Sequence, residues 1–338
     1  MSSLPISFVV WLRSIYLPMV AVLAIAYGVF GYLYFSLLTA GQPGKSGVMQ
    51  ASFLIGIPFC MGVVVNVLLR RDPNTGFLHA AGLTGVSLLG FVLAAYLLLN
   101  EGMICIIMAI PLFLIFGLLA WVVIRILSYL VPKSWRDGHK SVAFVLLLPF
   151  VSGVIEAPAE PPVKTREYAR SIVVDTTPDK LWNQIKDSTN IQPGELRDGF
   201  AYRIGMPYPI EALTPEPWVG GKRQIRLTRG VKFEEEITAW EPTRHLAWRY
   251  LFKPDSFPPG SLDDHIVLGG AYFDIEHTSY TLTPVPSANG GRATRLTLHI
   301  RARLSTNFNW YAAWWSDFMI GNTAETLLKF YQQRANPV

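Results

Sequence analysis

The segment VKFEEEITAW, residues 231–240, contains the carboxylate with the strongest indication of chemistry in this chain. Its residue types predict a β-strand, in which alternate side chains point to opposite faces. One face then combines a carboxylate with apolar residues: Phe233, Glu235, Ile237 and Ala239. A carboxylate in such surroundings must be paired or have a raised pKa. Either state suits holding the polar head of a ligand or moving a proton, so Glu235 is the candidate general acid or base.

A second run, IEHTSYTLT, residues 275–283, repeats this pattern. Alternation places Glu276 beside Thr278, Tyr280 and Leu282. For both carboxylates three other structures remain open: an ion pair with an arginine, a β-bulge that shifts the register, and an edge position in water. Both glutamates are therefore binding candidates, and the fold must decide how each is paired.

Other kinds of chemistry have less support. The histidines of the C-terminal half show neither HxxxH nor HxH spacing, so we expect no metal site there; they are His245, His265, His277 and His299. Ser279 and Ser316 lack the sequence context of a nucleophile elbow. Cys60 and Cys105 both lie in apolar runs of the N-terminal half, so the C-terminal half can form no disulfide. We expect no cofactor.

A sheet in the C-terminal half must position these residues. The run REYARSIVVD predicts a strand, and TTPDKLWNQIKD predicts a short helix with Thr177 as N-cap and Pro178 at its first position. Five further strand-like runs follow: QIRLTRG, VKFEEEITAW, RHLAWRYLF, IEHTSYTLTPV and TRLTLHIRARLS. Residues 309–335 then predict a long amphipathic helix. This order predicts an α+β fold, in which a curved antiparallel sheet wraps around the C-terminal helix.

Alternation gives the predicted sheet one apolar and one charged face. In RHLAWRYLF, residues 244–252, the apolar face consists of Leu246, Trp248, Tyr250 and Phe252. In RLTLHIRARL, residues 295–304, Leu298 lies on the apolar face and Arg301 on the charged one. The last helix carries aromatic residues at i, i+3, i+4 and i+7 spacing: Tyr311, Trp314, Trp315 and Phe318. These faces predict one core, which is either solid or encloses a cavity.

Several motifs of this half carry a resemblance to a known superfamily. TTPDKLWNQIKD, FEEEITAWEPTRHLAWRY and WYAAWWSDFMIGNTAETLLKFYQQRA resemble the helix-grip fold of START-like proteins, the SRPBCC superfamily, which includes polyketide cyclases and lipid-transfer modules. More narrowly, IGMPYPIEA, FEEEITAWEP and WYAAWWSDFMI resemble bacterial polyketide-cyclase-like membrane proteins of unassigned function. The resemblance covers about residues 165–335.

The resemblance implies a long cavity between the sheet and the C-terminal helix, in which an apolar small molecule binds. It implies no catalytic motif, because this fold serves binding, transfer and several unrelated reactions. Taken with the alternation, it gives these ligand-binding candidates: Phe233, Glu235, Ile237, Trp248, Tyr250, Phe252, Glu276, Tyr280, Leu298, Trp314 and Phe318.

The apolar runs of the N-terminal half predict a membrane domain. The whole chain is 51% hydrophobic and 16% charged, and few of the charges fall in this half. Four runs are long enough to cross about 30 Å of hydrocarbon: residues 15–38, 51–69, 77–99 and 103–124. No acidic residue lies within these spans, so we expect them to anchor the chain rather than to transport a solute. The predicted fold class is therefore an all-α transmembrane bundle followed by the α+β domain.

Residues 141–157 decide where the C-terminal half lies. They are short and mostly apolar with Pro149 in the middle, and we interpret them as a fifth span, with a re-entrant or interfacial segment as the alternative. Arg70 and Arg71 follow the second span, whereas Asn100 and Glu101 follow the third, so the positive-inside rule places the N-terminus in the cytoplasm. Five spans place the C-terminal half in the periplasm of a bacterial inner membrane, and four leave it cytoplasmic. Residues 158–164 predict a Pro-rich linker, and residues 165–338 the START-like domain.

The favoured function is a membrane-anchored module that binds or presents a lipid or other apolar small molecule without catalysing a reaction. The alternative is an enzyme of the cyclase or dehydratase kind that uses Glu235 as general acid or base. A membrane-bound interaction scaffold is a further alternative and requires a filled core. The C-terminal half is nearly neutral, so we expect no nucleic-acid partner. The sequence identifies no protein partner.

Overall fold

The chain forms two compact units, Met1–Glu160 and Pro161–Val338, each with a core of its own. The computed structural model describes residues 6–42, 45–69, 76–99, 101–130, 139–263, 265–287 and 292–335. The orientation prediction uses Arg70, Arg71 and Asn100, which lie outside the described residues.

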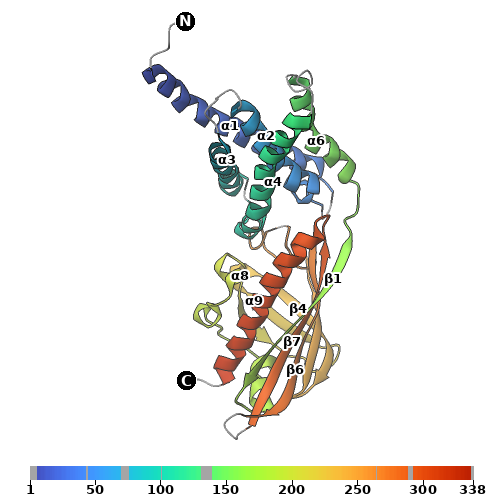
Figure 1. Ribbon diagram of the computed structural model, residues 1–338. Coiled ribbons are helices and arrows are strands. Elements are labelled where there is room, and N and C mark those ends of the chain that lie inside the picture. The colour runs from blue at the N-terminus through green and yellow to red at the C-terminus, as the bar shows by residue number, and fades with distance from the viewer. Residues whose placement is uncertain are drawn as a thin grey trace. The chain divides into compact units, whose positions relative to one another are not determined.

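The N-terminal unit consists of apolar helices (Figure 1). They are α1 (Ile6–Leu38), α2 (Ile57–Leu69), α3 (Phe77–Leu98), α4 (Met103–Leu130) and α6 (His139–Glu156), with a π-helical turn at Ser52–Gly56 before α2. Four stretches of 24, 18, 22 and 25 residues are long and apolar enough to cross a membrane: Ile15–Leu38, Ser52–Leu69, Phe77–Leu98 and Met103–Leu127. Even the shortest covers about 27 Å at about 1.5 Å per residue. The fifth predicted segment corresponds to a shorter apolar helix, Val142–Glu156.

Helix α6 packs along the other helices of this unit. The hydroxyl of Tyr27 in α1 donates to the carbonyl oxygen of Leu146 at 2.7 Å. At the other end of α6, the carboxylate of Glu156 accepts hydrogen bonds from the backbone N–H groups of Ala51 and Ser52, at 2.7 and 2.9 Å. These N–H groups begin the helical segment that leads into α2, and a carboxylate there satisfies donors that lack an intrahelical partner. The C-terminal end of α6 therefore lies beside the connection between α1 and α2.

Two glycines allow close helix packing in this unit. A Cβ at Gly62 in α2 would lie 2.1 Å from the carbonyl oxygen of Gly117 in α4, which is far inside contact distance. A Cβ at Gly56 would lie 3.0 Å from the ring of Pro149 in α6. Small residues at such crossings let helix backbones approach closely, which is how apolar helices associate in a membrane.

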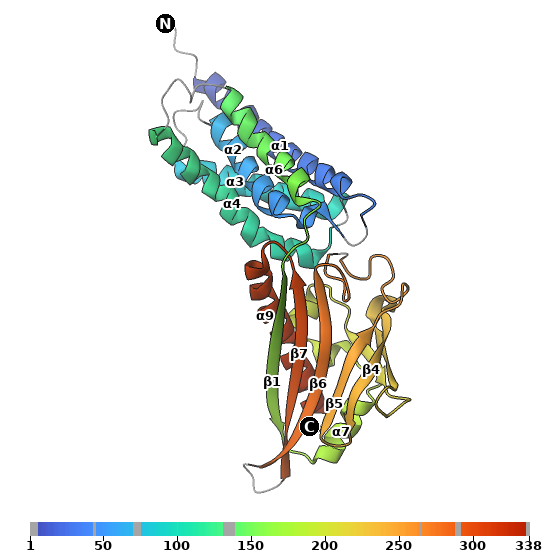
Figure 2. The same cartoon turned by 90° about the vertical axis from the view of Figure 1, so that its right-hand side faces the viewer.

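The C-terminal unit is built on a seven-stranded antiparallel sheet, and Figure 2 shows β1, β7, β6, β5 and β4 side by side. Its strands are β1 (Val163–Val174), β2 (Pro209–Leu213), β3 (Lys222–Leu227), β4 (Lys232–Glu241), β5 (His245–Leu251), β6 (Phe273–Pro286) and β7 (Arg292–Ser305). Their order across the sheet is β1-β7-β6-β5-β4-β3-β2. Strand β1 begins inside the range predicted as a linker.

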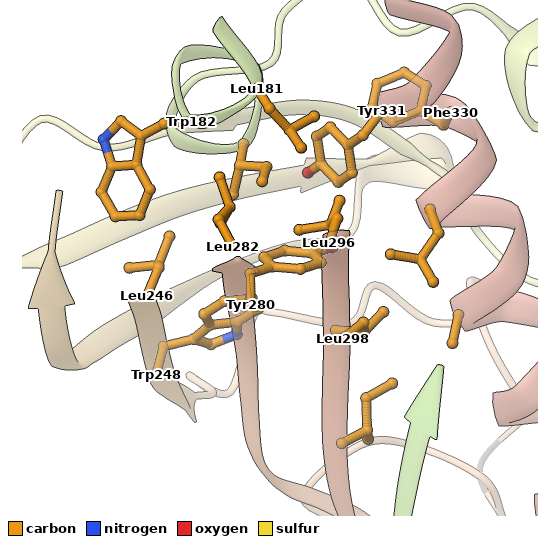
Figure 3. Close-up of a cluster of buried hydrophobic side chains, with 14 of the residues drawn as sticks. Leu181, Trp182, Leu246, Trp248, Tyr280, Leu282, Leu296, Leu298, Phe330 and Tyr331 are labelled. Carbon is orange, nitrogen blue, oxygen red and sulfur yellow. The ribbon is translucent and has the colours of Figure 1, made fainter. Parts of the chain in front are cut away.

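Three helices complete this unit: α7 (Pro178–Lys186), α8 (Phe200–Arg203) and α9 (Asn309–Ala335). Thr177 and Pro178 occupy the predicted N-cap and first helical positions of α7, and the Thr177 side chain makes no capping hydrogen bond. Helix α9 lies across the inner face of the sheet (Figure 1). Figure 3 shows the core they enclose, which includes Leu181, Trp182, Leu246, Trp248, Tyr280, Leu282, Leu296, Leu298, Phe330 and Tyr331. A curled antiparallel sheet that grips one long helix is the helix-grip fold, so the predicted fold classes of both halves are confirmed.

Two β-bulges change the faces expected from simple alternation. In β4 the register shifts between Ile237 and Ala239, so Ala239 pairs with Ala247 and leaves the face that carries Glu235. The prediction that Ala239 shares this face is therefore wrong. Trp240 takes its place, and its ring packs against that of Trp182 at 5.0 Å. The second bulge, in β6, places Glu276 at the shift in register.

Candidate functional site

A buried ion pair lies on the inner face of the sheet, between β3 and β4. Arg223 in β3 is directly opposite Glu235 in β4, so their side chains share one face of the sheet. The Nη1 atom of Arg223 donates to Oε2 of Glu235 at 2.5 Å. Only 2% of the Arg223 side chain and 6% of the Glu235 side chain are exposed. The inward-facing carboxylate of Glu235 is therefore paired with an arginine.

Arg223 uses its other donors to hold α7 against the sheet. Its Nη2 donates to the carbonyl oxygen of Ile185 at 3.1 Å, and its Nε donates to Oγ1 of Thr214 at 3.2 Å. The Ile185 carbonyl belongs to the last turn of α7, where a positive charge is favourable. The guanidinium also stacks over the ring of Trp248, with Cζ 4.8 Å from the ring centre. Arg223 is therefore a fixed part of the core.

Burial destabilises the charged form of Glu235. Burial raises the pKa of Glu235 from its ordinary value of 4.5 to about 7, because desolvation of the carboxylate outweighs the opposing effect of the Arg223 charge. The carboxyl therefore changes its protonation state near neutral pH. Such a group can accept or donate a proton, or exchange its partner for a ligand, under ordinary conditions.

Trp248, in β5, contributes an unused hydrogen-bond donor beside this pair. Its side chain is 4% exposed and its indole Nε1 has no hydrogen-bond partner. The indole is close enough to Glu235 to lower the pKa of that carboxyl without reaching hydrogen-bond geometry. An unpaired buried donor costs about 1–3 kcal/mol. Trp248 therefore places a buried N–H donor beside both Glu235 and Tyr250.

Tyrosines extend this polar region through the core. The hydroxyl of Tyr250 lies 2.9 Å from Oγ1 of Thr278, and burial raises the pKa of Tyr250. Tyr280 lies between Trp248 and Tyr331 of α9 (Figure 3), and its ring centre is 5.5 Å from each of theirs. We call Arg223, Glu235, Trp248, Tyr250 and Thr278 the polar cluster.

Half-buried aromatic residues adjoin the polar cluster. The ring of Phe233 lies 5.8 Å from that of Tyr250 and 5.5 Å from that of Phe252, and the ring of Phe257 lies 5.3 Å from Phe252. We call Phe233, Tyr250, Phe252 and Phe257 the aromatic cluster. The long connection between β5 and β6 continues from it and is pinned to β7 by Arg303, whose Nη2 donates to the carbonyl oxygen of Gly270 at 2.6 Å. Polar and apolar surfaces therefore meet on one inner face, as an amphipathic ligand would require.

The structure separates the predicted binding residues into two groups. The inner face of the sheet brings together Phe233, Glu235, Ile237, Trp248, Tyr250, Phe252, Tyr280 and Leu298. Glu276 instead pairs with Arg301, whose Nε lies 3.1 Å from its Oε2, and its side chain is 35% exposed. Trp314 and Phe318 lie on the exposed side of α9. These three residues therefore lie outside the site.

Arg223 is the main residue that sequence reasoning missed. In KRQIRL it alternates in phase with Ile225, which is also buried, so period-two reasoning places both on the inner face. Pairing of this run with the following FEEEI strand then sets Arg223 opposite Glu235. Thr214 precedes β3 in a turn and had no comparable signal. Among the described residues, no group of three or more His, Cys, Asp or Glu side chains is arranged to hold a metal ion.

Comparison with known proteins found similarity to solved structures only. No family model matches the chain, and no curated protein matches it. A START superfamily protein from Mycobacterium smegmatis is 9% identical, with coverage of 50% of this chain and 96% of that one and a TM-score of 0.33. Norcoclaurine synthase from Thalictrum flavum is 10% identical, covering 51% and 86%, with a TM-score of 0.31. An aromatase/cyclase from a Streptomyces species is 13% identical, covering 51% and 94%, with a TM-score of 0.30. At these values the similarities assign neither a ligand nor an activity.

Proposed function

We propose that this protein is a membrane-anchored helix-grip module that binds a lipid or another amphipathic small molecule on the inner face of its sheet. The observation that carries this proposal is the polar cluster itself, an ion pair and an unpaired donor buried in an otherwise apolar core. A buried pair of this kind is a poor source of stability, because desolvation offsets its attraction. Arg223 also holds α7, and the adjoining Glu235 carboxyl and Trp248 N–H group support a role in holding the polar part of a ligand.

In this proposal the polar cluster and the aromatic cluster bind different parts of the ligand. Trp248 donates to an oxygen of the ligand head, and the Glu235 carboxyl accepts from or donates to a second polar atom. The aromatic cluster receives the apolar part of the ligand. Its partly exposed rings gain about 25 cal/mol for each Å² of apolar surface removed from water. The ligand is thus held by a few oriented polar contacts in a mostly apolar site.

Helix α6 acts in this proposal as a fifth span. Its apolar part, Val142–Glu156, covers about 22 Å, and its last residue, Glu156, lies at the bundle end where α1 joins α2. The α3–α4 connection belongs to the same end, since the Tyr32 hydroxyl of α1 donates to Glu101 at 2.6 Å. The sequence places its basic connections at the opposite end, so the positive-inside rule puts the C-terminal unit outside the cytoplasm. In a bacterial inner membrane this side is the periplasm.

Labelling of single cysteines tests this orientation. Lys164→Cys places a thiol on an exposed position of β1, and Tyr129→Cys places one at the far end of α4. A membrane-impermeant maleimide added to intact cells with a permeable outer membrane should label the first variant and not the second. The reverse pattern contradicts the fifth span and leaves the C-terminal unit cytoplasmic.

Uptake of a dansyl-labelled fatty acid by the purified full chain tests the binding function. Trp248→Phe keeps a ring beneath Arg223 and removes only the N–H group, so affinity should fall about two- to tenfold. Trp315→Phe is the matched control, because Trp315 Nε1 is likewise buried without a partner but lies on α9 outside both clusters. Any probe that binds to the membrane helices contributes the same background signal in the parent and in both variants. Equal uptake by both variants and the parent contradicts the proposed site.

One observation favours a catalytic role as the second candidate. Because the pKa of Glu235 is about 7, this carboxyl can serve as general acid or base at neutral pH. In a binding module Glu235→Gln alters affinity alone. In an enzyme of the cyclase or dehydratase kind, it abolishes turnover of a bound molecule that mass spectrometry still detects. Chemical conversion of a ligand by the parent and not by this variant would therefore decide for the enzyme.

A further inference from the structure

Helix α9 exposes a row of large aromatic side chains at its N-terminal half. Trp310, Trp314 and Phe318 are 63%, 58% and 45% exposed, and their spacing of four residues places them on one side of the helix. We call these three residues the tryptophan stripe. The opposite side of the same turns is buried against the rest of the unit, through residues such as Tyr311 and Trp315. Trp314 packs against Trp315 at 5.0 Å and Phe318 against Phe200 at 5.2 Å, and about half of each side chain still remains exposed.

The character of this exposed side changes along the helix. Glu325 and Lys329 continue the same side toward the C-terminal end, and both are exposed charged residues of the kind a water-facing helix carries. Aromatic residues occupy only the first half. Isolated exposed apolar residues are ordinary, but three large ones in a row on an otherwise charged side indicate an interaction surface.

The stripe lies next to the point where the chain enters this unit. The side-chain Nδ2 of Asn309, the first residue of α9, donates to the carbonyl oxygen of Pro162 at 2.5 Å. Val163 follows, pairs with Ser305 of β7 and is itself 66% exposed. Residues 157–162 connect this point to the end of α6 and reach at most about 20 Å at about 3.3 Å per residue. The connection between α6 and β1 is therefore short.

We propose that the tryptophan stripe docks the C-terminal unit on the lipid–water interface of the membrane that anchors it. Indole rings favour this interface because they combine a large apolar body with a polar N–H group. The carboxylate of Asp317, next to the stripe along the helix, is paired, since it accepts two hydrogen bonds from Nη2 of Arg166, at 2.8 and 2.7 Å. Pairing reduces the cost of bringing this acid close to the bilayer. The proposal holds on either side of the membrane.

Docking of the stripe would also bring the proposed binding site close to a source of ligand in the bilayer. This part of the inference rests on the proposed binding function. Strand register places the start of β1, the ends of β5 and β7 and the start of β6 at one end of the sheet, and the aromatic cluster lies at that end. The long connection between β5 and β6 closes the same end. A unit docked through the stripe thus presents the aromatic cluster toward the bilayer, from which an amphipathic ligand can enter without crossing water.

Quenching by brominated lipid tests the docking. The full chain is reconstituted in phosphatidylcholine vesicles with and without bromine on the acyl chains, together with the variants Trp314→Phe, Trp310→Phe and Trp218→Phe. Subtracting each variant from the parent isolates the emission of one tryptophan. Trp218 is the matched control, because it is 54% exposed in the turn between β2 and β3, at the opposite end of the sheet. We expect brominated lipid to remove most of the Trp310 and Trp314 emission and to leave the Trp218 emission unchanged.

Two results would overturn this proposal. Emission from Trp310 and Trp314 that is as red and as unquenched as that of Trp218 means that the stripe faces water. Blue-shifted emission without quenching means that protein, rather than lipid, covers it. The measurement needs no ligand, so a failure of the binding function leaves its outcome unchanged. The three Trp→Phe changes are at exposed positions, and matching circular dichroism spectra will show that each variant is folded.

Discussion

Replacing Glu235 with Gln should remove a pH dependence of stability that a single carboxyl creates. Gln keeps an oxygen that accepts from Arg223 and cannot ionise. In the parent, the pKa of Glu235 is raised from 4.5 to about 7 on folding, so the folded state binds more protons than the unfolded state between these values. Stability due to this group is therefore greatest below about pH 4.5, falls as the pH rises to about 7 and is constant above.

The size of this effect follows from the shift. A change of one pKa unit corresponds to about 1.4 kcal/mol, so the rise from 4.5 to about 7 corresponds to about 3 kcal/mol at full ionisation. For a domain of this size 1 kcal/mol moves Tm by about 2–4 °C. At about pH 8 the Glu235→Gln variant should therefore melt about 6–12 °C above the parent, and near pH 5 the difference should shrink to about 2–3 °C.

Thermal melting of the full chain in detergent, followed by near-ultraviolet circular dichroism from about pH 5 to about pH 8, measures this difference. Glu236→Gln is the control, because Glu236 is the next residue, faces the other side of β4 and forms an exposed pair with Arg249 at 2.9 Å. An exposed pair contributes about 0–1 kcal/mol, so this variant should follow the parent. Loss of stability in Glu235→Gln at about pH 8 would refute the reasoning, because the ion pair would then stabilise the fold.

Two further predictions concern the packing of each unit. Gly62→Leu should prevent α2 from approaching α4, because even a Cβ would lie 2.1 Å from the carbonyl oxygen of Gly117. Size-exclusion chromatography should then show loss of the monodisperse protein. Gly82→Leu is the control and should leave the protein intact, because a Cβ at Gly82 meets no atom within 4 Å. Arg334→Ala should lower the free energy of local unfolding at the end of α9 by about 1–3 kcal/mol, because Arg334 donates to Glu195 at 2.7 and 3.0 Å. Faster amide exchange of residues 325–335 would show this loss, and unchanged exchange would contradict it.

The sequence predicted the fold well where local signals and periodicity agree. The Thr177–Pro178 cap, the alternating runs and the long final helix each define an element on their own, and their order leaves few topologies. Strand β2 was missed because PIEAL is short and contains a proline and a charge. Its pairing depends on β3, which is a tertiary contact that no local pattern contains.

The site was predicted in part, for a similar reason. Alternation placed Glu235 correctly on the inner face, and an arginine partner was among the open alternatives. A bulge adds a residue that alternation cannot anticipate, and this displaced both Ala239 and Glu276 from their expected places. Spacing also put Trp314 and Phe318 in one helical row with buried residues, but only packing decides which side of an aromatic-rich helix faces the sheet.

Native mass spectrometry of the full chain, purified from cells and released from detergent in the spectrometer, tests ligand binding at the polar cluster most directly. We expect one small amphipathic molecule per chain in the parent and in Trp315→Phe, and reduced occupancy in Trp248→Phe, which lacks the N–H group that would bind it. Identical spectra for all three proteins, with no bound molecule that depends on Trp248, would contradict it.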